Sequence, residues 1–170
     1  MFGLTSLGLI HTAIGLVALV AGAAALLRHG AISPRDGRAG QVYLGATLFT
    51  CLTGFGIFQH GGFGPPHALG LLTLLVLALA ELAERRAPFG TASVYVSTVA
   101  YSLSFFLHFI PGTTETFTRL PQGAPLFTGP DDPALQKVVG TLFLVFVLGA
   151  GLQVRHLRAQ RAPLRAMRSA

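Results

Sequence analysis

Five apolar stretches, each close to the length of a membrane span, constrain the fold of this chain more than any other feature. They cover residues Leu4–Leu27, Gln41–Gln59, Pro66–Ala83, Ala92–Ile110 and Ala134–Val154. A helix that rises about 1.5 Å per residue crosses the hydrocarbon of a bilayer in about 20 residues. Because a single strand in lipid would leave its backbone polar groups unpaired, each stretch is predicted to be a transmembrane helix.

The composition agrees with a chain whose solvent is lipid. Of its 170 residues 52% are hydrophobic and only 11% are charged, whereas about a quarter of the residues in a soluble domain are charged. The net charge of +6 comes from basic residues between and after the apolar stretches, so the predicted partner is the lipid bilayer and no nucleic acid is expected. The prediction is an all-α integral membrane helical bundle, with one domain in residues 1–155, an outer loop at 111–133 and a basic cytoplasmic tail at 156–170.

The distribution of basic residues predicts the orientation. Ten arginines fall on one side of the predicted topology and only Arg119 and Lys137 fall on the other; the ten are Arg28, Arg35, Arg38, Arg85, Arg86, Arg155, Arg158, Arg161, Arg165 and Arg168. Cytoplasmic loops carry such an excess of positive charge. We therefore expect the N-terminus outside and the C-terminus in the cytoplasm, in a multi-pass protein of the bacterial inner (plasma) membrane. No basic residue precedes the first stretch, as would be typical of a signal peptide, so that stretch is expected to be a retained helix.

Histidines are the candidate functional residues, because an ionisable group in a membrane span is costly. The alternating topology places His11, His60, His67 and His108 towards the outer side. Imidazole is a common ligand of transition metals, so all four are candidate cofactor ligands. By depth, His60, His67 and His108 form the more compact set for a metal ion such as zinc or copper, whereas a pair that binds haem b would include His11. The alternative is that these histidines are structural.

Helical spacing predicts which faces point inward. Ser93, Ser97, Tyr101, Ser104 and His108 recur at intervals of three and four, so they should form one polar stripe that avoids lipid. His11 lies on a stripe of small residues that permits close helix approach. Glu81 is the only carboxylate expected near the membrane, paired with Arg85 one turn later, and no pair of intramembrane carboxylates is predicted.

The remaining polar segments carry no catalytic signature. The chain has neither a glycine-rich phosphate loop nor a His-Glu-x-x-His motif, and its single cysteine, Cys51, excludes an intrachain disulfide, so an enzyme is not indicated. Glu115 and Arg119 in the outer loop are four residues apart and would pair on one helical turn. The loop is therefore predicted to be either a short interfacial helix or a solvated connector.

Three segments resemble a domain-of-unknown-function family of small bacterial multi-helix membrane proteins. They are residues 37–43 (Gly-Arg-Ala-Gly-Gln-Val-Tyr), residues 63–67 (Phe-Gly-Pro-Pro-His) and the early His11, and the similarity extends over residues 1 to about 110. The family pattern has a His-Arg pair before its Gly-x-Val-Tyr stretch, where this chain has Asp36, Gly37 and Arg38. His11 and His67 match the pattern. The resemblance implies a helical membrane protein and no particular activity.

Three functions remain open from the sequence. The first is a haem- or metal-binding protein that uses the outer histidines for electron transfer or metal handling. The second is a non-catalytic accessory subunit that packs against other membrane subunits or in a homo-oligomer. The third is a small transporter, for which a polar path lined by Glu81 or by the stripe from Ser93 to Ser104 should cross the bundle.

Overall fold

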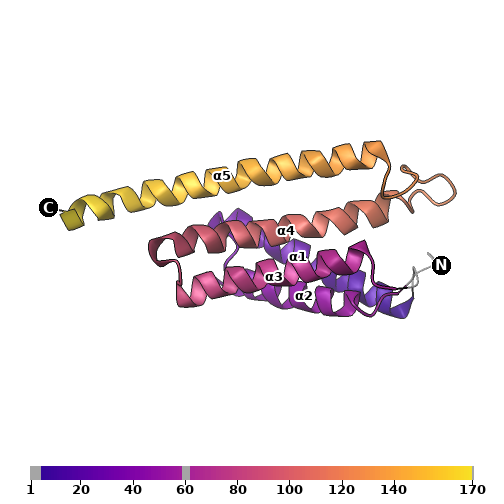
Figure 1. The fold of residues 1–170 in the computed structure, drawn as a ribbon, viewed down its shortest axis with the longest axis horizontal. Helices are drawn as coiled ribbons and strands as arrows, with labels where there is room; N and C mark the ends of the chain where they lie inside the picture. Colours follow the sequence, from indigo (N-terminus) through magenta and orange to yellow (C-terminus); the bar gives the residue numbers. More distant parts are fainter. Residues whose placement is uncertain (1–4, 59–61, 170) are drawn as a thin grey trace.

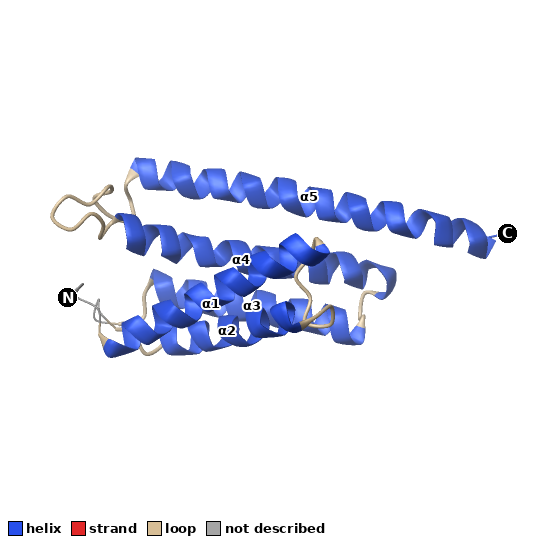
Figure 2. Ribbon diagram, turned by 180° about the vertical axis from the view of Figure 1, so that it is seen from behind, coloured by secondary structure: helices blue, strands red, loops and turns tan. Residues whose placement is uncertain are grey.

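The structure is a computed structural model that describes residues 5–58 and 62–169, and every regular element in these ranges is helical (Figures 1 and 2). The elements in chain order are α1 (Ser6–His29), α2 (Arg38–Gly54), α3 (Pro65–Arg86), the short 3₁₀ helix η1 (Gly90–Ala92), α4 (Ser93–Phe117) and α5 (Pro133–Ser169). Four segments are long and apolar enough to cross a membrane, namely Ser6–His29, Pro65–Arg86, Gly90–Phe117 and Pro133–Arg161. With 17 residues, α2 is the shortest of the five α-helices.

Successive α-helices run in opposite directions, and α1 to α4 form a bundle with α5 along its side (Figure 1). The closest packing joins α1 to α2, α3 to α4 and α4 to α5, with α2 also against α3. This arrangement gathers the arginine-bearing helix ends at one end of the bundle, which we call the basic end. We call the opposite end, where α1 and α3 begin, the far end.

Small residues allow α1 to approach its neighbours closely. Ala18 and Ala25 are almost completely buried against the core, which also contains Tyr43 of α2. A Cβ atom at Gly22 would lie 2.6 Å from the ring of Phe105 and 2.9 Å from that of Tyr43. Glycine at this position therefore lets side chains from α2 and α4 reach the backbone of α1.

The fourth helix is longer than the sequence predicts. It continues past Ile110 to Phe117, so the first seven residues of the predicted outer loop are helical, and Pro111 lies inside the helix. Proline has no N–H to donate to the carbonyl one turn earlier. Just after the proline, Thr113 and Thr114 donate their hydroxyls to the carbonyls of Phe109 and Ile110 at 2.7 and 2.8 Å. The predicted ion pair between Glu115 and Arg119 is confirmed at 2.5 Å.

The fifth helix contacts the bundle mainly through α4. Asp132 caps its first turn by accepting the amide N–H of Ala134 at 2.8 Å, and its other oxygen accepts the amide N–H of Thr128 in the preceding loop at 2.9 Å. These hydrogen bonds, the Thr128 amide foremost, hold the pKa of Asp132 below its usual range. Beyond the cap the helix runs on through the predicted basic tail to Ser169. Its outer face is apolar and exposed over Leu144, Val145, Leu148 and Leu152, as expected of a helix that faces lipid.

Candidate functional site

A line of polar side chains runs along the inner face of α4. Ser93 and Ser97 are 3% and 6% exposed, Tyr101 and Ser104 are fully buried, and His108 is half-buried. The stripe thus points into the bundle, as its spacing predicts. From Ser93 to His108 it covers about 22 Å along the helix axis at 1.5 Å per residue, which is most of the thickness of a bilayer core.

Two carboxylates of α3 meet at one hydroxyl of this line. Tyr101 donates its phenolic proton to Oε1 of Glu81 at 2.6 Å and lies 3.3 Å from Oε2 of Glu84. Ser33, from the segment between α1 and α2, donates to the other oxygen of Glu84 at 2.5 Å. Glu81 also forms the predicted ion pair with Arg85. Because a phenol has a single proton, it can donate to only one of the two carboxylates at a time.

The sequence predicts Glu81 as the only carboxylate near the membrane, whereas in the structure Glu84 lies at the same hydroxyl of Tyr101. The predicted third stretch ends at Ala83, one residue before Glu84, whereas α3 continues to Arg86. A signal for the pair was present in the sequence, because residues three apart lie on the same face of a helix. Tyr101, which contacts both carboxylates, and Ser33, which donates to Glu84, are distant in the chain and gave no local signal.

The middle of the line is bonded to α2. Ser104 donates its hydroxyl to the carbonyl of Tyr101 at 2.8 Å, and its oxygen lies 2.6 Å from the hydroxyl of Tyr43. Since the proton of Ser104 points to that carbonyl, the hydroxyl of Tyr43 is the donor to Ser104. The ring of His108 follows, 6.0 Å from the ring of Tyr43 between centroids.

The hydrogen bonds of His11 and His108 leave an unprotonated ε nitrogen on each ring. His108 donates from Nδ1 to the carbonyl of Ser104 at 2.9 Å, and its buried Nε2 has no partner among the described residues. His11 lies 3.1 Å through Nδ1 from the hydroxyl of Thr53, which itself donates to the carbonyl of Phe49. His11 must therefore donate from Nδ1 as well. A neutral imidazole that donates from one nitrogen presents the lone pair of the other, as metal-ligating histidines do.

The hydrogen bonding of His67 differs from that of His11 and His108. Its Nδ1 accepts the amide N–H of Gly64 at 3.2 Å, so in the neutral ring Nε2 carries the proton. The ring stacks against Phe55, Phe58 and Phe63, with centroid distances of 6.4, 5.0 and 5.2 Å. These contacts give His67 a structural role at the start of α3.

The predicted histidine cluster is only partly assembled in the described residues. His60 lies outside them, and within 5–58 and 62–169 no three His, Cys, Asp or Glu side chains are placed to hold a metal ion. His11 and His108 are near enough to interact electrostatically. Of the proposed ligands, these two bring free ring nitrogens from α1 and α4 into the same half of the bundle.

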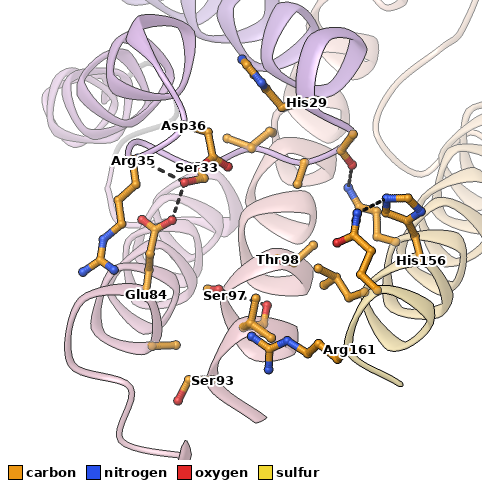
Figure 3. A pocket seen from close by; sticks show the side chains of 18 of the residues that line it. His29, Ser33, Arg35, Asp36, Glu84, Ser93, Ser97, Thr98, His156 and Arg161 are labelled. Atoms are coloured by element: carbon orange, nitrogen blue, oxygen red, sulfur yellow. Dashed lines mark hydrogen bonds between the residues drawn. The ribbon is translucent and has the colours of Figure 1, made fainter. Parts of the chain in front are cut away.

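A cavity of about 750 Å³ opens at the basic end (Figure 3). Its walls come from the segment after α1, the end of α3, the beginning of α4 and the second half of α5. Glu84, Ser93 and Ser97 line it, so the polar line of α4 begins in this cavity. The cavity is also lined by His29 and His156, which the sequence places only in basic segments. Its volume is in the range typical of small-ligand sites.

Comparisons of the chain with protein-family models, with curated proteins and with solved structures find no match. The resemblance carried by His11, His67 and residues 37–43 therefore stays a prediction.

Proposed function

We propose that this chain is a small transporter that conducts protons through a five-span bundle, between the basic-end cavity and the half of the bundle that contains His11 and His108. The observation that supports this proposal best is the buried polar line of α4, to which the carboxylates of Glu81 and Glu84 are hydrogen-bonded through Tyr101. Ionisable groups inside a membrane span are expensive, and they mark proton and ion pathways.

The groups along this line can both accept and donate protons. Glu84 faces the cavity and exchanges a proton with Glu81 through the hydroxyl of Tyr101. Further along, Tyr43, Ser104 and His108 form the second part of the path. The carbonyl of Tyr101 that joins the two parts accepts a hydrogen bond but cannot pass a proton on. The path is continuous only if water bridges the hydroxyls of Tyr101 and Ser104.

The direction of the helices supports five spans. Because α1 and α3 both begin at the far end (Figure 1), the chain must return from the basic end between them, and α2 is the helix that makes this return. At about 1.5 Å per residue its 17 residues cover about 25 Å. The arginines of the basic end support a cytoplasmic location for that end and an N-terminus outside.

Cysteine labelling tests this topology. In a Cys51→Ser background, Thr128→Cys lies in the segment before α5 and should react with a membrane-impermeant maleimide in intact cells. Asp36→Cys, in the segment between α1 and α2, should react only after the membrane is opened. Labelling of Asp36→Cys in intact cells would contradict the orientation, and equal labelling of both positions would contradict the number of spans.

Proton conduction is tested with the purified protein in liposomes that contain a pH-sensitive dye. A potassium gradient with valinomycin sets the membrane potential, and the internal pH should change faster than in protein-free liposomes. A rate equal to that of protein-free liposomes over a range of protein densities would refute the proposal.

A second candidate function is the binding of haem or a metal ion by His11 and His108. The observation that favours it is that both rings donate from Nδ1 and leave Nε2 unprotonated. Two imidazoles suit an axial pair for haem iron or a two-coordinate soft ion better than a tetrahedral zinc site, which needs three or four ligands.

The absorption spectrum of the purified protein checks this candidate. A Soret band, or stoichiometric metal by elemental analysis, is expected to disappear in His11→Ala and in His108→Ala. It should persist in His67→Ala, because Nδ1 of His67 accepts the amide of Gly64 and Nε2 of the neutral ring carries the proton. Exposed His156→Ala controls for the loss of any histidine. A colourless, metal-free wild-type protein, or a band that depends on His67 alone, would exclude the pair.

A further inference from the structure

The walls of the basic-end cavity carry opposite charges. Both carboxylates of the lining, Glu84 and Asp36, lie on the side formed by the end of α3 and the segment between α1 and α2, where Arg35 also lines the cavity and donates to the carbonyl of Arg85. The α5 side contributes His156 and Arg161. Figure 3 shows Glu84 beside Ser33 on one side of the cavity, with His156 and Arg161 across from it. A ligand that fills the space would meet an acidic wall at one end and a basic wall at the other.

Arg161 in the basic wall is anchored by neighbouring residues and still has N–H groups free to bind a ligand. Arg161 donates one N–H to the carbonyl of Thr91 at 3.0 Å, and its guanidinium lies 5.7 Å from the centre of the Tyr95 ring. A guanidinium has five N–H groups, so this anchoring leaves four of them for a ligand. His156 accepts from the amide of Gln160 at 2.8 Å through Nε2, which leaves its Nδ1–H as a further donor.

The acidic wall has acceptor capacity to spare. Glu84 receives the hydroxyl of Ser33 on one oxygen and lies at a long 3.3 Å from the hydroxyl of Tyr101 through the other. A carboxylate offers about four lone-pair positions, so it can accept further hydrogen bonds. Between the walls, the cavity is lined by one face of α4, which carries the buried residues Ser93, Ser97 and Thr98.

From this distribution we infer that the cavity binds a small zwitterion, with a primary ammonium at Glu84 and a phosphate or carboxylate at Arg161. Arg35 can offset one of the two carboxylates, so a purely anionic ligand would leave the other without a counter-charge, and a purely cationic ligand would do the same to Arg161. The lining therefore selects against both. The inference goes beyond proton conduction and does not depend on it.

Two kinds of ligand carry an ammonium and an anionic group together and could reach this cavity. One is the phosphoethanolamine headgroup of a membrane lipid, which would enter a cavity at the basic end of membrane-spanning helices. The other is a free zwitterion of similar size. Phosphatidylethanolamine has both charges and a hydrogen-bonding ammonium, phosphatidylglycerol lacks the ammonium, and the quaternary ammonium of phosphatidylcholine cannot donate a hydrogen bond. The three lipids therefore separate the contributions of the two walls.

Lipid binding to the full chain in detergent tests the inference, with dissociation constants from native mass spectrometry for lipids of identical acyl chains. Phosphatidylethanolamine should bind about tenfold more tightly than phosphatidylglycerol or phosphatidylcholine, as expected for one charge-assisted hydrogen bond. Glu84→Gln should abolish that preference, and Asp36→Asn, a second variant on the same wall, should reduce it. Arg161→Gln should weaken binding of phosphatidylethanolamine and phosphatidylglycerol alike. Exposed Arg158→Gln, which does not line the cavity, should leave all three constants unchanged.

Competition by free phosphoethanolamine decides between the two sources. Displacement of the lipid at similar concentration would show that the free zwitterion is sufficient, and displacement only by the lipid would assign the site to the headgroup; both results support the inference. Tighter binding of phosphatidylglycerol than of phosphatidylethanolamine, insensitive to Glu84→Gln, would overturn it, as would equal binding of all three lipids or the absence of binding. Circular dichroism checks that each variant remains helical.

Discussion

Tyr101→Phe is expected to slow proton flux through the protein in liposomes by about 100-fold, the usual effect of removing a positioned proton-transfer group. Within the described part of the chain, the hydroxyl of Tyr101 is the group that is hydrogen-bonded to both Glu81 and Glu84. Phenylalanine fills the same fully buried space without that hydroxyl. The two carboxylates then lose their common proton carrier while the helix packing stays the same.

Stability and flux must be measured together for this variant. Loss of the hydroxyl leaves acceptor oxygens of Glu81 and Glu84 without their donor, which should cost about 1–3 kcal/mol and lower the melting temperature in detergent. Tyr95→Phe is the matched control, because Tyr95 lies on the same helix beneath Arg161 and its ring, which makes that contact, is retained. If Tyr101→Phe folds and conducts at the wild-type rate, the path does not pass through Tyr101.

Gly40→Ala is expected to have the largest effect on stability, about 3 kcal/mol or more. A Cβ atom at Gly40 would overlap the carbonyl group of Ser33 and lie 2.9 Å from the backbone nitrogen of Pro34. These are backbone atoms, so no rotation of a side chain can relieve the clash. The segment between α1 and α2 would have to move, and Ser33 would lose its hydrogen bond to Glu84.

Gly45→Ala is the control on the same helix. A Cβ atom at Gly45 would meet nothing within 4 Å, so alanine should leave stability unchanged or raise it by about 0.5–1 kcal/mol through its better helix propensity. Thermal unfolding in detergent, followed by circular dichroism, compares the two variants. A Gly40→Ala protein as stable as Gly45→Ala would mean that α2 does not pack against Ser33 as described.

Local patterns were sufficient for part of the candidate site. The period of α4 predicted that Ser93, Ser97, Tyr101 and Ser104 share a buried face, because side-chain direction follows directly from position in a helix. The ion pair between Glu81 and Arg85 was predictable for the same reason, since its members are four residues apart. The pattern did not predict the end of α4, because the helix continues past Pro111 to Phe117. In this part the hydroxyls of Thr113 and Thr114 donate to carbonyls of the same helix.

The amino-acid sequence by itself determined that the chain is helical, that its long helices are apolar enough for a membrane, and that the arginines gather at one end. Each of these properties depends on composition and on spacing within one segment. Only the tertiary structure decided that Glu84 meets Tyr101 and Ser33, which is 51 residues away, and that Gln153 of α5 bonds the carbonyl of Gly30 across 123 residues. It also decided the protonated nitrogen of His11, His67 and His108 and the charge of the two cavity walls. These features depend on the rotation and register of helices against one another, which close contacts such as those of Gly22 and Gly40 set and no local pattern encodes.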